Sequence, residues 1–164
     1  MAAAAAGISM WSTLVPVITG GVIGLVGGWL GPWLLERKKE AAEKKKRRAD
    51  KFEELVDALY AFDHWIDTDR LRFAYGEDHP REVSPFAKLR ATAAVYFPQF
   101  NAAIDGLDTA TSGYRVWMSE AGQRRLAGQT NSINDGFNEA YKPYLLKREA
   151  LVKILTEFAR TEFR

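Results

Sequence analysis

The first 35 residues of the chain contain no Asp, Glu, Lys or Arg. From Met10 to Leu35 the sequence reads MWSTLVPVITGGVIGLVGGWLGPWLL, a run of 26 uncharged residues. A helix needs about 20 apolar residues to cross the roughly 30 Å of bilayer hydrocarbon. All 23 Lys and Arg and all 21 Asp and Glu residues lie after this run, within residues 36–164. The sequence therefore predicts a single transmembrane helix over residues 11–35, followed by a segment suited to water.

Tryptophans near the two ends support this prediction. Trp11 and Trp33 are 22 residues apart, which is about 33 Å along a helix that rises 1.5 Å per residue. Indole rings favour the headgroup region of a bilayer. The predicted membrane-interface anchors are therefore Trp11, Trp29 and Trp33.

A cleaved signal peptide is the main alternative for this segment. A signal peptide has a basic region before a shorter apolar core and a small-residue cleavage site. Residues 1–35 contain no base, and the apolar run leads directly into a charged helix. The pattern favours a retained membrane anchor.

The charges on the two flanks predict an orientation. Residues 36–48 carry eight bases and three acids, whereas residues 1–10 carry none. The positive-inside rule places such a basic flank in the cytoplasm. In a bacterial host we therefore expect an inner-membrane protein with residues 1–10 outside, a juxtamembrane stalk helix over 36–51 and residues 52–164 in the cytoplasm.

The stalk bases are expected to contact anionic lipid, at about 1 kcal/mol per base near the surface. A nucleic-acid or nuclear-localisation patch is the alternative reading of such a run, and the neighbouring membrane span disfavours it. The predicted lipid contacts are Arg37, Lys38, Lys39, Lys44, Lys45, Lys46, Arg47 and Arg48.

Glycines in the predicted span form a pattern of their own. On an ideal helix, six of them fall within an arc of about 120°, and they repeat with the small-x-x-x-small spacing that lets helices approach closely in lipid. We expect a helix-packing face for a homo-oligomer or another membrane protein, although Gly is frequent in membrane helices generally. The face consists of Gly20, Gly21, Gly24, Gly27, Gly28 and Gly31.

Residues 52–164 are predicted to form an all-α domain, a bundle of about four helices. Phe52, Leu55, Leu59, Phe62 and Ile66 are spaced three and four residues apart, as on the buried face of an amphipathic helix. Strand signals are poor, because β-branched runs and hairpin dipeptides are scarce.

Glycine, proline and serine suggest where these helices begin and end. The first helix should end near Tyr75–Gly76, and Ser84–Pro85 is typical of a helix start. Pro98 should begin or kink another helix. Gly122 to Thr130 resembles a turn region, with a short turn of helix at Arg124–Leu126 as the alternative for that part. The last helix is expected to run to about Glu162, with Pro143 bending it or beginning a new one.

The chemistry-bearing residues are sparse. There is no cysteine and there are two histidines, so thiolate catalysis and Cys-based zinc sites are excluded. A carboxylate–arginine pocket around His64, Asp67 and Asp69 is one candidate ligand site; an ordinary half-exposed histidine is the simpler reading. Arginines that would form an anion pocket if they converged are Arg70, Arg72, Arg81, Arg90, Arg115, Arg124 and Arg125.

These features favour a non-enzymatic, membrane-tethered interaction or regulatory module without a cofactor. Its expected partners are the lipid bilayer, a second copy or another membrane protein, and a cytosolic protein. Nucleic acid is not expected, because residues 51–164 have 15 bases against 17 acids and lack the excess of base typical of such domains. The alternatives are a membrane-anchored ligand sensor or enzyme using the His64 region, and a pore-forming membrane effector.

Overall fold

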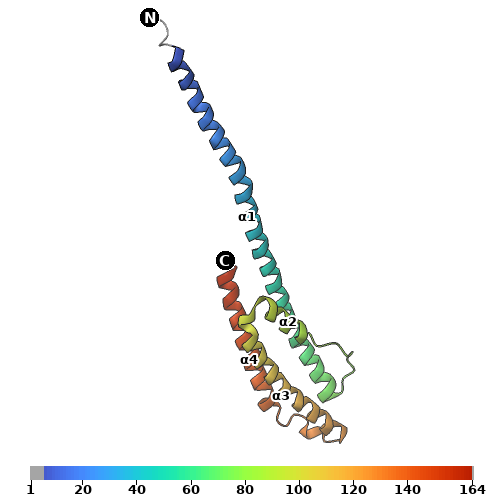
Figure 1. Ribbon diagram of the computed structural model, residues 1–164. Coiled ribbons are helices and arrows are strands. Elements are labelled where there is room, and N and C mark those ends of the chain that lie inside the picture. Colours follow the sequence, from blue (N-terminus) through green and yellow to red (C-terminus); the bar gives the residue numbers. More distant parts are fainter. Residues whose placement is uncertain (1–5, 164) are drawn as a thin grey trace. The chain divides into compact units, whose positions relative to one another are not determined.

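The protein is all-helical. The structure is a computed structural model that describes the backbone of residues 6–163 and the side chains of residues 35–163, and this part contains no β-strand. Four α-helices follow one another along the chain: α1 (Ala6–Arg70), α2 (Phe86–Tyr96), α3 (Asn101–Leu126) and α4 (Phe137–Glu162) (Figure 1). Three short helical segments connect them, a π-helix η1 (Leu71–Tyr75) and two 3₁₀ segments, η2 (Pro98–Phe100) and η3 (Thr130–Ser132). The all-α prediction is confirmed.

The chain divides into two compact units, Met1–Arg47 and Arg48–Arg164. In the first unit the predicted membrane helix 11–35, with its glycine face and tryptophan anchors, lies outside the residues whose side chains are described, except for Leu35. Between Leu35 and Phe163, the structure holds no helix with the length and hydropathy that crossing a membrane requires.

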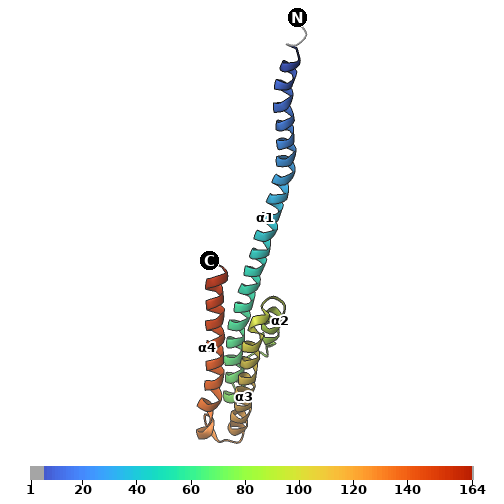
Figure 2. The same ribbon diagram turned by 60° about the vertical axis from the view of Figure 1, so that its left-hand side comes forward.

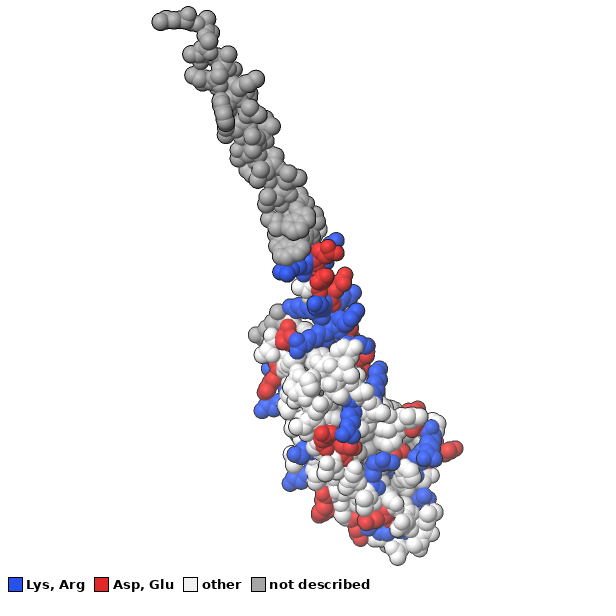
Figure 3. Space-filling view, in the orientation of Figure 1, with Lys and Arg blue, Asp and Glu red and all other residues white. Residues whose placement is uncertain are grey.

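Most of the stalk residues that follow are exposed. Every side chain from Leu35 to Arg48 is exposed to solvent, and Lys and Arg crowd this stretch of α1 (Figure 3). Arg48 begins the second unit, where its guanidinium forms a 2.9 Å ion pair with Glu162 and lies 5.7 Å from the centre of the Phe158 ring. Arg48 is thus attached to α4.

The second unit is a helical bundle. α3 and α4 form an antiparallel pair joined by residues 127–136, and the C-terminal part of α1 lies beside both (Figures 1 and 2). The predicted apolar stripe of α1, from Phe52 to Ile66, is buried in the core. Its partners are buried side chains of α2, α3 and α4, including Leu89, Ile104, Leu107, Met118, Leu151 and Leu155.

The first helix ends where the sequence predicts, although through a π-helical turn that the sequence did not suggest. Gly76 has a φ of 75°, and its N–H donates to the carbonyl of Arg72. The N–H of Glu77 donates to the carbonyl of Leu71 at 3.1 Å. Because glycine adopts a positive φ at little cost, Gly76 ends the helix and turns the chain back along α1.

The predicted helix starts at Ser84–Pro85 and Pro98 are also confirmed. The Ser84 hydroxyl accepts a hydrogen bond from the N–H of Phe86 at 3.3 Å, at the start of α2. Pro98 opens η2, which leads directly into α3. Pro143 lies inside α4, which runs on to Glu162 as predicted.

The prediction that Gly122 begins a turn region is wrong, because α3 continues to Leu126. Gly122 is buried in the helix, and a Cβ at this position would lie 2.6 Å from the carbonyl oxygen of Phe73. The glycine therefore permits a close backbone approach between η1 and α3. Its presence in the sequence reflects packing and not chain reversal.

Gly122→Ala should destabilise the bundle by about 1–3 kcal/mol, because the backbone of η1 must shift to admit the methyl group. Gly113→Ala is the matched control: it lies in the same helix, and no atom lies within 4 Å of a Cβ built there. That control should be neutral or stabilising by up to about 1 kcal/mol, since Ala is the better helix former. Chemical denaturation of the full chain measures both values, and equal effects would contradict the close-packing explanation.

Candidate functional site

An open pocket of about 410 Å³ lies at the junction of three elements. These are η1, α3 and the loop that precedes α2. Three of the seven candidate arginines, Arg72, Arg81 and Arg115, line it together with the buried carboxylate of Asp69. The remaining lining residues are Trp65, Phe73, Glu82, Val83 and Ser84. These residues come from three separate segments of the chain.

Asp69 and two aromatic rings hold two of the arginines in place. Asp69 is 5% exposed, and its carboxylate accepts a hydrogen bond from the Arg72 guanidinium at 3.1 Å. The same guanidinium lies 4.4 Å from the centre of the Phe73 ring. Arg115 lies 5.4 Å from the centre of the Trp65 ring. Cation–π contacts of this kind orient a guanidinium without neutralising its charge.

The loop carrying Arg81 is attached to α1 by the indole of Trp65. The Trp65 Nε1–H donates to the backbone carbonyl of Glu82 at 3.1 Å. This bond holds the loop against the helix and places Arg81 at the pocket. Within residues 35–163, Arg81 and Arg115 form no ion pair.

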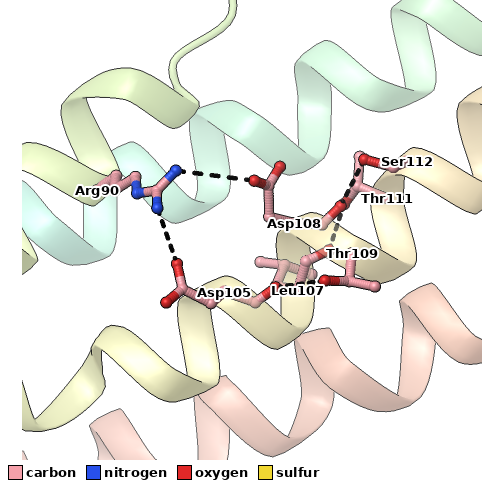
Figure 4. Close-up of polar contacts among 7 residues, drawn as sticks. All are labelled: Arg90, Asp105, Leu107, Asp108, Thr109, Thr111 and Ser112. Atoms are coloured by element: carbon pink, nitrogen blue, oxygen red, sulfur yellow. Dashed lines mark hydrogen bonds and ion pairs between the residues drawn. The ribbon is translucent and has the colours of Figure 1, made fainter.

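The other candidate arginines lie elsewhere. Arg90 on α2 reaches two acids of α3, Asp105 at 3.3 Å and Asp108 at 4.0 Å (Figure 4). Arg70 pairs with Asp67 at 3.4 Å, and Arg124 donates to the backbone carbonyl of Asp135 at 3.1 Å. Arg125 lies against Gly76. The convergence envisaged from the sequence therefore involves three of the seven.

Of the three residues proposed around His64, one enters the pocket. Asp69 lines it, whereas Asp67 is exposed and paired with Arg70. His64 is exposed and does not line this pocket. Trp65 and Phe73 also line the pocket, and they were not predicted from the sequence. Their positions on either side of Asp69 and Arg72 in the sequence were the signal that could have identified them.

A second, apolar groove of about 230 Å³ runs between α1 and α4. None of the residues that line it is charged: they are Phe52, Val56, Leu59, Tyr60, Val152, Leu155, Thr156 and Ala159. It offers few polar groups to orient a ligand, so the arginine-lined pocket is the better-equipped site.

A partly buried polar contact joins α1 to α4. The Asp63 carboxylate accepts two hydrogen bonds of 2.7 Å, one from the Tyr144 hydroxyl and one from Nε of Arg148. Burial and the bond to Asp63 raise the pKa of Tyr144, and the bond to Asp63 raises that of Arg148. Both shifts favour the protonated form of the donor.

Tyr114 lies next to this contact but differs from Tyr144. The two rings stack with centroids 5.6 Å apart. The Tyr114 side chain is fully buried. Among the described residues its hydroxyl has Arg70 as a polar neighbour but forms no hydrogen bond of good geometry. Burial raises the pKa of Tyr114 to about 12, although the charge of Arg70 acts in the opposite direction. The phenol therefore stays protonated in its buried position.

Comparisons with models of known protein families, with curated proteins and with solved structures find no match to this chain.

Tyr144→Phe and Tyr114→Phe form a matched pair of variants. Tyr144→Phe should cost about 1–2 kcal/mol of stability, because it removes a hydrogen bond to a largely buried carboxylate. Tyr114→Phe should change stability by less than about 0.5 kcal/mol, since the hydroxyl that it removes forms no hydrogen bond of good geometry. Denaturant unfolding of the full chain compares them, and a larger loss for Tyr114→Phe would show that its hydroxyl has a partner.

Proposed function

We propose that this protein is a single-pass membrane protein whose helical bundle is a non-enzymatic, membrane-tethered interaction or regulatory module. The observation that carries the proposal is the 26-residue uncharged run from Met10 to Leu35, which is long enough to cross a bilayer as a helix. The continuous backbone of α1 from Ala6 to Arg70 supports it, because the whole run falls within one helix.

The proposed orientation has the N-terminus outside and the bundle in the cytoplasm, at the inner membrane of a bacterial host. The exposed bases of the stalk support this arrangement, since bases flanking a span are retained on the cytoplasmic side. They would also attract the headgroups of anionic lipids. Arg48 contributes less to lipid binding, because its charge is partly offset by Glu162.

Charges placed inside the proposed span test the anchor. Leu25→Lys combined with Val26→Lys should prevent stable insertion, because each Lys costs about 3 kcal/mol near the centre of a membrane helix. The control is Ala41→Lys with Ala42→Lys, which adds the same charges to the exposed stalk. Membrane fractionation followed by alkaline extraction should recover wild type and control, but not the span variant, as integral protein.

Protease added to spheroplasts tests the orientation in the same cells. The bundle should resist digestion until the membrane is opened with detergent. If the unmodified chain were released by alkaline extraction, the membrane proposal would fail. If it stayed integral but the bundle were digested from outside, only the orientation would fail.

The glycine face is proposed to bind a second copy or another membrane protein through close helix packing. Gly24→Leu with Gly28→Leu should abolish that association, because the added side chains separate the helix backbones. The control is Val22→Leu with Val26→Leu, which enlarges side chains at the same spacing on the opposite face of an ideal helix. Crosslinking in native membranes, with mass spectrometry, should show one adduct lost in the glycine variant alone.

A ligand sensor is the second candidate function. It is favoured by the arginine-lined pocket, where Arg81 and Arg115 have no ion-pair partner among the described residues. Sensing would require ligand binding to alter what the bundle presents to a partner.

A further inference from the structure

We propose that the arginine-lined pocket binds a phosphate monoester carried on a small, flat apolar group. This inference goes beyond tethering, because it concerns a ligand of the bundle itself and does not depend on the membrane span. The pocket's volume of about 410 Å³ is within the range of about 300–1,000 Å³ that small-molecule sites occupy.

The charges of the pocket favour an anion. Asp69 is already satisfied by Arg72 through their 3.1 Å contact. The other two arginines, Arg81 and Arg115, carry positive charges that only the exposed acid Glu82 offsets among the lining residues. The lining residues therefore have a net positive charge. This contrasts with residues 51–164 as a whole, where 17 acids exceed 15 bases.

The number and origin of the guanidinium groups favour a phosphate. A planar carboxylate is matched by one or two guanidinium forks, whereas a tetrahedral phosphate accepts hydrogen bonds from several directions. Here the three arginines come from η1, from the loop before α2 and from α3. Such a set can surround a phosphate from three sides.

The pocket is organised before any ligand arrives. Asp69 and the Phe73 ring hold Arg72, the Trp65 ring supports Arg115, and the bond from Trp65 to the Glu82 carbonyl holds the Arg81 loop. Side chains held in this way lose less conformational freedom when they bind. An arginine on an open surface has no comparable support.

Phe73 provides the contact for the rest of the ligand. Its side chain lines the pocket and is 42% exposed, although it belongs to a π-helical turn packed on α3. π-helical segments are rare and frequently occur at functional sites. An aromatic group attached to the phosphate would contact the part of this ring that Arg72 leaves exposed and would bury that apolar surface.

Calorimetry on the full chain in phosphatidylcholine nanodiscs tests the inference with two probes, inorganic phosphate and phenyl phosphate. Phenyl phosphate should bind at one site per chain and severalfold more tightly than phosphate, since ring contacts add to the affinity. Arg115→Gln and Arg81→Gln should each weaken both probes by about tenfold or more. Phe73→Ala should remove the preference for phenyl phosphate. It should weaken phosphate binding less than the Arg81 and Arg115 variants do, because Asp69 still holds Arg72.

Arg90→Gln is the matched control, because Arg90 is an exposed arginine that pairs with acids of α3 outside the pocket. It should bind both probes like wild type. Arg81 lies in an exposed loop and forms no ion pair in the described chain. Its substitution should leave the unfolding midpoint unchanged, so that a loss of binding can be separated from a loss of folding.

Two results would overturn the inference: no binding of phenyl phosphate, or equal binding by wild type and the Arg81 and Arg115 variants. The second would assign the probe to another basic region, such as the exposed stalk. Glycerol phosphate, the headgroup fragment of anionic lipids, distinguishes a lipid source from a free ligand. If it bound more tightly than phenyl phosphate, through the same arginines, the phosphate site would be supported and the role of Phe73 overturned.

Discussion

The backbone of η1 lies directly against α3 at Gly122, where a Cβ would come within 2.6 Å of the Phe73 carbonyl oxygen. Any larger residue would separate the two elements, and Arg72 and Phe73 would then move away from Arg115. The pocket therefore depends on a backbone contact that is possible because residue 122 has a hydrogen atom in place of a Cβ. Gly76 completes the arrangement, because its positive φ directs the following loop back along α1 to Trp65.

The contact centred on Asp63 has a different role in the bundle. Apolar helix faces attract one another with little directional preference, so they tolerate small shifts along the helix axis. A carboxylate that accepts two hydrogen bonds of 2.7 Å does not tolerate such shifts. Moving α4 by one turn would leave its charge largely buried and unpaired. Asp63 thus specifies how α4 is aligned with α1, while the surrounding aromatic rings provide most of the buried surface.

The features that could be predicted from sequence are those set by neighbouring residues. The spacing of Phe52 to Ile66 defines a helix face wherever the helix packs, and Pro98 and Gly76 act on their own backbone. Gly122 was misread because a helical glycine and a turn glycine look alike until the packing partner, 49 residues earlier, is known. The pocket could not be derived for the same reason: Arg72, Arg81 and Arg115 meet only in the folded chain.

The two positively charged regions differ in the physics by which they attract anions. The stalk is an exposed run of bases, so its attraction is long-range and falls as salt shortens the Debye length to about 8 Å at physiological ionic strength. The pocket is a small positive region within a domain of net negative charge, and that field repels extended polyanions. An anion is favoured there only if it fits between the guanidinium groups and forms directed hydrogen bonds. The proposed attraction to a charged membrane surface and the proposed recognition of one small phosphate compound are therefore separable.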